Sequence, residues 1–277
     1  MVLVLAGEAI FFLPFVLPRV FRPTLLEVFQ ITNLELGALF SVYGLVAMAA
    51  YFFGGPLADR YVPRNLLALA LVITGLGGGV LMSNPSFTGL LWLYGFWGLS
   101  TILLFWAALL KATRLWGTIQ TQGAAFGWLE GGRGAVAALI ATVSVTIFAM
   151  VTPENAADLT NAERLNAWSQ VVLFISVVTV AIGILVWWVL PNKSNAEANI
   201  EKKTGDHLSL NMLRPLLRKK TIWLQSIIIV CAYAGYKITD DFSLYAREVL
   251  GYEEARAAMV GALALWLRPI IAVSVGI

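Results

Sequence analysis

The chain has 277 residues, of which 59% are hydrophobic and only 13% are charged, and its mean hydropathy is +0.80. Soluble domains carry about 25% charged residues, so composition excludes a soluble globular domain for most of this sequence. The formal net charge of +3 comes from Lys and Arg residues in short segments between apolar runs, which is typical of membrane topology and not of nucleic-acid binding. One cysteine and one histidine give no basis for a disulfide framework, a metal site or a cofactor.

Eight apolar segments come close to or exceed the roughly 20 residues that cross a bilayer as a helix. A backbone in contact with lipid must satisfy its own hydrogen bonds, so we expect each segment to be helical. The predicted fold class is therefore an all-α polytopic membrane protein. The predicted spans are residues 3–21, 35–54, 66–83, 88–110, 121–150, 166–190, 221–246 and 255–277.

The connections between these spans alternate in charge. The first, third and fifth connections carry few cations, whereas the second, fourth and sixth are basic. The sixth connection, residues 191–220, has seven cations against three acids. Basic connections lie on the cytoplasmic side. We therefore predict a cytoplasmic N-terminus and a multi-pass protein of the inner (plasma) membrane.

Three regions follow from this topology. Residues 1–190 are expected to form a six-helix bundle, residues 191–220 a basic cytoplasmic linker, and residues 221–277 the incomplete start of a second bundle. Six helices, a charged linker and more helices is the plan of a two-bundle transporter, whose site lies near mid-membrane between the halves. The sequence stops inside an apolar run, so we expect a fragment of a longer chain.

The most specific motif follows the second span and reads Gly55-Pro56-Leu57-Ala58-Asp59-Arg60-Tyr61-Val62-Pro63-Arg64. It resembles the signature loop of the major facilitator superfamily, which joins helices two and three on the cytoplasmic side. The resemblance implies a fold of twelve helices, of which about eight are present. It also implies a cytoplasmic gate loop with an ion-pair latch, which would involve Gly55, Asp59, Arg60 and Arg64.

Within that superfamily, the sequence is most similar in style to the organophosphate:phosphate antiporter branch. The similarity rests on Leu36-Gly37-x-x-x-Ser41-x-Tyr43-Gly44, on Asp59-Arg60-x-x-Pro63-Arg64 and on the charged seventh span. One departure is clear. Where that branch has a phosphate-binding arginine in helix one, this sequence has Val16, and the arginine of helix seven falls near Gly235.

Ionisable side chains within the apolar runs are candidate functional residues, because a charge in a membrane costs several kcal/mol unless it is paired or hydrated. Spacing of three or four residues on a helix predicts two pairs, Glu130 with Arg133 and Lys237 with Asp240 or Asp241. We predict that Arg133, Lys237 and Arg268 bind an anion, and that Glu130, Asp240 and Asp241 balance charge or carry a coupling proton. Paired charges that never touch solute are the alternative.

The leading interpretation is a secondary active transporter of a small organic anion bearing a carboxylate, sulfonate or phosphate. Its expected partners are the solute, the lipid bilayer and a coupling proton or counter-anion, and it is expected to be monomeric. A proton-coupled sugar or drug carrier and a transporter-like solute sensor are the alternatives. An enzyme is not predicted, because the sequence has no nucleophile–base pair and no metal-ligand cluster. Glu8, in the first span, fits an interfacial acid or a proton site equally well.

Overall fold

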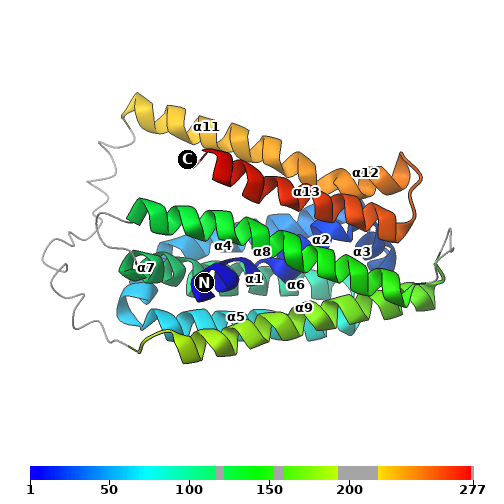
Figure 1. Cartoon of the computed structure of the whole chain (residues 1–277), viewed down its shortest axis with the longest axis horizontal. Coiled ribbons are helices and arrows are strands. Elements are labelled where there is room, and N and C mark those ends of the chain that lie inside the picture. Colours follow the sequence, from blue (N-terminus) through cyan, green and yellow to red (C-terminus); the bar gives the residue numbers. More distant parts are fainter. Residues whose placement is uncertain (117–121, 153–158, 193–217, 276–277) are drawn as a thin grey trace, which may run out of the picture.

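The computed structural model describes residues 1–116, 122–152, 159–192 and 218–275. These residues form helices that run mostly along the long axis of the molecule (Figure 1). Their bounds are α1 Val2–Ala9, η1 Phe12–Val16, α2 Leu17–Val20, α3 Arg22–Phe29, α4 Asn33–Arg60, α5 Pro63–Met82, α6 Phe87–Gly98, η2 Leu99–Trp106, α7 Ala107–Trp116, α8 Gln122–Val151, α9 Asn161–Val189, α11 Lys220–Lys237, η4 Ile238–Asp241, α12 Phe242–Glu248 and α13 Glu254–Val275.

The predicted fold class is confirmed. Six helical stretches in the described part are long and apolar enough to cross a membrane, and a pair bent by 45°, Val2–Ala9 with Phe12–Val20, makes a seventh. The eighth predicted segment corresponds to α13. The linker predicted at 191–220 lies mostly outside the described residues.

Polar caps fix where two of the long helices begin. Thr32 accepts a hydrogen bond from the backbone N–H of Glu35, and the Glu35 carboxylate accepts one from the Thr32 N–H. Thr160 and Glu163 form the same capping box at the start of α9. Each box satisfies N–H groups that the first turn of a helix leaves without partners. As a result both helices begin before the apolar windows predicted from sequence.

The connection between the first two predicted spans, 3–21 and 35–54, is mostly helical. Residues Leu17–Val20 form α2 and Arg22–Phe29 form α3. A π-helical segment, η1, precedes them and contains Pro14. π-helical turns are rare and occur often at functional sites. The first span is bent by 45° just before this segment, between Ala9 and Phe12, and Arg19 is buried one turn after it.

Two pairs of helices make the most extensive contacts. Helices α5 and α9 pack together on one side of the molecule, and α13 packs on α8 on the opposite side (Figure 1). The α5–α9 contact is close, because a Cβ on Gly75 would lie 3.1 Å from the Ser176 carbonyl oxygen. In contrast, no described residue of α11 is buried.

The two ends of the bundle differ in charge. The C-terminal ends of α4 and α7 and the N-terminal ends of α5 and α11 lie together at the left of Figure 1, and they carry Arg60, Arg64, Lys111, Arg114 and Lys220. We call this the basic end, which the positive-inside rule assigns to the cytoplasm. Helices α3 and α12 and the start of α13 lie at the opposite end, which we call the outer end.

Candidate functional site

A cavity of about 790 Å³ lies between the first bundle and α11. Its size is within the range of pockets that hold small organic ligands. Four ionisable side chains with opposite charges line it, namely Glu8, Arg19, Arg133 and Lys237. Two of these, Arg133 and Lys237, are predicted site residues, so the structure brings them to one cavity.

Aromatic rings make up much of the remaining wall. They come from helices before and after the basic linker in the sequence, and they are Phe11, Phe15, Tyr43, Tyr51, Trp106, Tyr233 and Tyr236. The Arg133 guanidinium lies 5.6 Å from the ring centres of both Phe11 and Trp106. The Lys237 ammonium lies 5.2 Å from the ring centre of Phe40. Cation–π contacts of this kind keep buried cations in place without neutralising them.

Arg133 is held by two carboxylates. Its Nη1 donates to Glu130 Oε1 at 2.7 Å, which confirms the pair predicted from spacing on α8. Its Nε donates to Glu8 Oε2 at 3.1 Å, and this contact joins α8 to α1. Glu8 is 4% exposed and lines the cavity, so it is a buried cavity acid. A Cβ on Gly7 would lie 3.1 Å from Arg133 Cδ, so the small residue beside Glu8 makes room for this arginine.

A second charged group surrounds Asp240, where η4 meets α2. The Lys237 Nζ contacts Asp240 Oδ2, which confirms the pair predicted from their spacing of three residues. The other oxygen, Oδ1, accepts from Arg19 Nε at 2.5 Å. Arg19 also donates through Nη1 to the Tyr236 hydroxyl at 2.5 Å. One buried carboxylate therefore bridges two cations that line the cavity.

Two other predicted residues lie elsewhere. Asp241 does not join Lys237; its Oδ1 lies 3.3 Å from Arg22 Nε, and its side chain is half exposed. Arg268 belongs to α13, but its side chain lies outside the described residues. The cavity therefore contains two of the three predicted anion-binding residues, and Arg268 cannot be placed with them.

Arg19 is the cavity residue that sequence reasoning missed. It lies near the end of the first predicted span, residues 3–21, and was not named as a site residue. In the structure it lies one turn after Val16, and both residues line the cavity. The available signal was its neighbourhood, since Leu17, Val20 and Phe21 continue the apolar run on both sides of it.

The signature motif lies at the basic end, and its conformation differs from the loop predicted. Residues Gly55–Arg60 form the last turns of α4, and α5 begins at Pro63. Gly55 has open space around it and is not closely packed, whereas Gly54 approaches the backbone of Ile102. Lys111 Nζ donates to the Ala58 carbonyl at 2.8 Å, which ties the end of α4 to α7.

The two arginines of the motif have different surroundings. Arg60 is exposed, whereas the Arg64 guanidinium lies 4.6 Å from the ring centre of Trp187 on α9. Arg64 Nε is buried and has no hydrogen-bond acceptor in the described part of the chain. Stacking on the indole therefore anchors Arg64 at the basic end, where α5 and α9 pack together.

No group of three His, Cys, Asp or Glu side chains that could hold a metal ion occurs within residues 1–116, 122–152, 159–192 and 218–275. The cavity wall offers paired charges and aromatic surface. Such a site is suited to binding an anionic or hydroxylated solute.

Comparison with known proteins identifies the family. Two curated proteins of Escherichia coli (strain K12) are each 29% identical to this chain. "Inner membrane protein YqcE" matches over 231 residues, which are 83% of this chain and 52% of the relative. "Inner membrane protein YihN" matches over 235 residues, which are 84% and 53% respectively. The chain thus spans about half the length of these relatives. The model of the "Major Facilitator Superfamily" matches residues 4–277, so the chain belongs to that superfamily.

Proposed function

We propose that this chain is the first bundle, and the start of the second, of a secondary active transporter that moves a small organic anion by alternating access. One observation carries the proposal: Arg19 and Lys237 line the cavity together and share one carboxylate, that of Asp240. On this side of the cavity two cations share one anion, which leaves a local positive charge for a solute carboxylate, sulfonate or phosphate. A guanidinium also offers bidentate geometry that an ammonium lacks.

We propose complementary roles for the other charged groups. Arg133 would contact solute from the α8 wall, with its charge balanced by Glu8 and Glu130. Arg268 would contribute from α13. Asp240 and Asp241 would balance charge at the opposite wall, and Glu130 or Asp240 would carry a coupling proton. The wall around Arg133 has two acids for one cation, whereas the wall around Asp240 has two cations for one acid. This difference in charge supports the assignment.

We also propose kinship with the organophosphate:phosphate antiporter branch. That branch has an arginine where this sequence has Val16, and Arg19 supplies a cation one turn later on the same cavity wall. This position supports anion binding by the first span. The full-length protein would be a monomer of the inner membrane, the compartment that the names of both E. coli relatives state.

A second candidate is a proton-coupled sugar carrier. Four tyrosines in the wall, Tyr43, Tyr51, Tyr233 and Tyr236, favour it, because their rings can stack on a sugar and their hydroxyls can hydrogen-bond to it. A drug carrier or a solute sensor would use the same cavity. Uptake measurements distinguish these alternatives.

The test is uptake by the full-length protein in proteoliposomes. A panel of labelled carboxylates, sulfonates and phosphate esters is compared with neutral sugars and hydrophobic cations. We expect uptake of at least one anion, loss of that uptake in Arg19→Ala and Lys237→Ala, and partial retention in Lys237→Arg. Uptake of neutral sugars alone would select the second candidate. Solute binding without uptake or exchange would select the sensor.

A further inference from the structure

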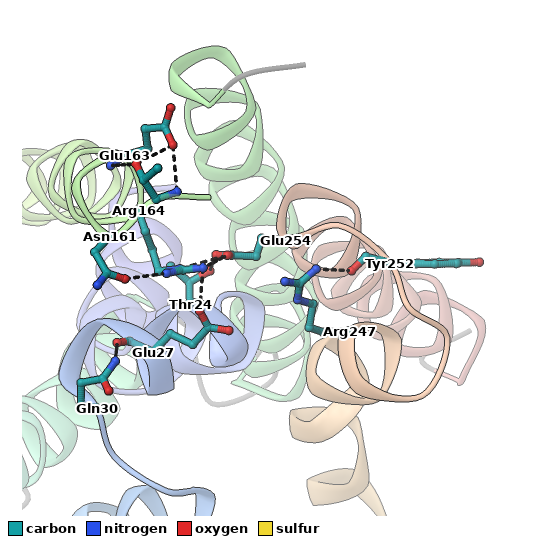
Figure 2. Close-up of polar contacts among 10 residues, drawn as sticks. Thr24, Glu27, Gln30, Asn161, Glu163, Arg164, Arg247, Tyr252 and Glu254 are labelled. Atoms are coloured by element: carbon teal, nitrogen blue, oxygen red, sulfur yellow. Dashed lines mark hydrogen bonds and ion pairs between the residues drawn. The ribbon is translucent and has the colours of Figure 1, made fainter. Parts of the chain in front are cut away.

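A second polar cluster lies at the outer end, where α3, α9 and α13 meet (Figure 2). Arg164, in the first turn of α9, donates from Nε and Nη2 to Glu254 Oε1 at 2.9 and 2.6 Å. The other Glu254 oxygen accepts from the Thr24 hydroxyl at 3.0 Å. The Arg164 and Glu254 side chains are only 7% and 3% exposed. This is a buried ion pair with further hydrogen bonds.

A second carboxylate binds the same guanidinium at the same time. Glu27 Oε2 lies 2.6 Å from Arg164 Nη2, and the Glu27 side chain is 41% exposed. Figure 2 shows Glu27 and Glu254 reaching Arg164 from different helices. Glu27 and Arg164 both belong to the bundle before the linker, whereas Glu254 begins α13 after it. Arg164 is thus shared between a carboxylate of its own half and one of the other half.

Further contacts join the two halves at this end. Arg22 Nη1 donates to the Asp240 carbonyl at 2.9 Å, and the Ser243 hydroxyl donates to the Arg19 carbonyl at 2.8 Å. The backbones also approach closely, since a Cβ on Gly261 would lie 3.1 Å from Val20 Cα. The cavity is therefore closed toward the outer end in this conformation. Alternating access requires these contacts to break.

We propose that Glu27, Arg164 and Glu254 form an outer latch in which Arg164 binds two carboxylates and releases only Glu254 when the cavity opens. The proposal rests on transport by alternating access. In the closed state Arg164 binds both acids; in the open state Glu254 leaves with α13 and Glu27 keeps Arg164 neutralised. Breaking a buried ion pair is costly when it leaves a charge uncompensated, so a second partner in the same half reduces the cost of opening. Glu254 then lies exposed at the N-terminus of α13, where the helix dipole favours an anion.

This arrangement assigns opposite effects to the two acids. Glu254→Gln removes the charge that joins the halves, so it favours the outward-open state. Glu27→Gln removes the partner that Arg164 retains on opening, and also the repulsion between two carboxylates in the closed state, so it favours closure. If the cluster served only for folding, the two substitutions would not change the opening equilibrium in opposite directions.

The experiment measures access to the cavity from outside. The full-length protein carries Cys231→Ser, which removes an exposed thiol, and Val16→Cys, at a position that lines the cavity. Right-side-out vesicles are treated with a membrane-impermeant maleimide, and the labelling rate is measured. We expect Glu254→Gln to label about five- to tenfold faster than this parent, as for a typical coupling between two states. Glu27→Gln should label more slowly than the parent.

Two additional variants control for folding and for charge. Thr24→Val removes one neutral hydrogen bond to Glu254, so it should increase the labelling rate by less than Glu254→Gln does. It tests the latch if Glu254→Gln does not fold. The swap Arg164→Glu with Glu254→Arg should return the rate to the parent value or below. Equal rates in all variants, or changes in the same direction for both acids, would overturn the latch. If the rates separate as expected but no anion is taken up, the latch stands and the proposed solute class fails.

Discussion

Arg133 and Glu8 are 125 positions apart in the sequence, yet Arg133 Nε donates to the Glu8 carboxylate at 3.1 Å. The contact joins the first and fifth spans beside the cavity. Glu130 binds the same guanidinium from one turn away on α8. The two acids differ in exposure, because the side chain of Glu8 is 5% exposed and that of Glu130 is 49% exposed.

This difference predicts unequal effects of two matched substitutions. Glu8→Gln should lower the free energy of unfolding by about 3 kcal/mol, because it weakens a buried ion pair. Glu130→Gln should lower it by about 0.5 kcal/mol, because the carboxylate that it removes is largely hydrated. Thermal unfolding of the purified full-length protein in detergent measures both. Equal destabilisation by the two variants would contradict the importance of burial here.

Neighbouring aspartates provide a second comparison. Asp240→Asn leaves Arg19 and Lys237 without their shared carboxylate, so the variant should be less stable by about 3 kcal/mol. Asp241→Asn removes a half-exposed partner of Arg22 and should cost less than about 1 kcal/mol.

A transported anion should partly restore the stability that Asp240→Asn removes, since a ligand that binds the folded state stabilises it. The added anion should therefore raise the apparent Tm of Asp240→Asn more than that of the parent. If the anion stabilises the parent and not this variant, Asp240 itself is part of the solute site.

The cavity charges that sequence predicted are those deep inside apolar runs. Arg133 and Lys237 stand out because most of their neighbours in the sequence are apolar, and spacing identified their nearby partners. Arg19, Arg164 and Glu254 lie near helix ends, where similar residues serve as ordinary interfacial charges. The Arg19–Asp240 contact spans 221 positions. Local periodicity cannot reveal a pairing that depends on how two bundles close against each other.

Helix positions were predicted well because span length follows from bilayer thickness. Helix ends were predicted less well, since a capping box such as Thr160 with Glu163 lies outside the apolar window predicted at 166–190. The irregular segment η1, which precedes the helix that carries Arg19, was also missed. A π-helical turn depends on packing against neighbouring helices, so composition alone does not indicate it.

Close packing of α4 on α6 gives a prediction about glycine. A Cβ on Gly98 would lie 2.8 Å from the Tyr43 carbonyl oxygen, which is backbone and cannot move aside. Gly98→Ala should therefore destabilise the protein by about 1–3 kcal/mol. Gly37, on α4, has open space around it, so Gly37→Ala should leave stability unchanged or raise it by about 0.5 kcal/mol. Apparent Tm values decide. Equal loss in both variants would contradict the packing argument, because Ala has the higher helix propensity and Gly37 has room for a Cβ.

The signature motif predicts a separation of binding from turnover. Asp59 is exposed in the last turn of α4 at the basic end, and it does not line the cavity. Asp59→Asn should therefore leave the affinity for the transported anion unchanged while slowing uptake at least tenfold, if the motif forms the cytoplasmic gate. Arg114→Gln, which removes an exposed cation at the same end outside the motif, is the matched control and should retain uptake. Stability should change by less than about 0.5 kcal/mol in both, because the two side chains are exposed. Weaker binding that accounts for all of the lost uptake in Asp59→Asn would place its effect at the solute site and not at a gate.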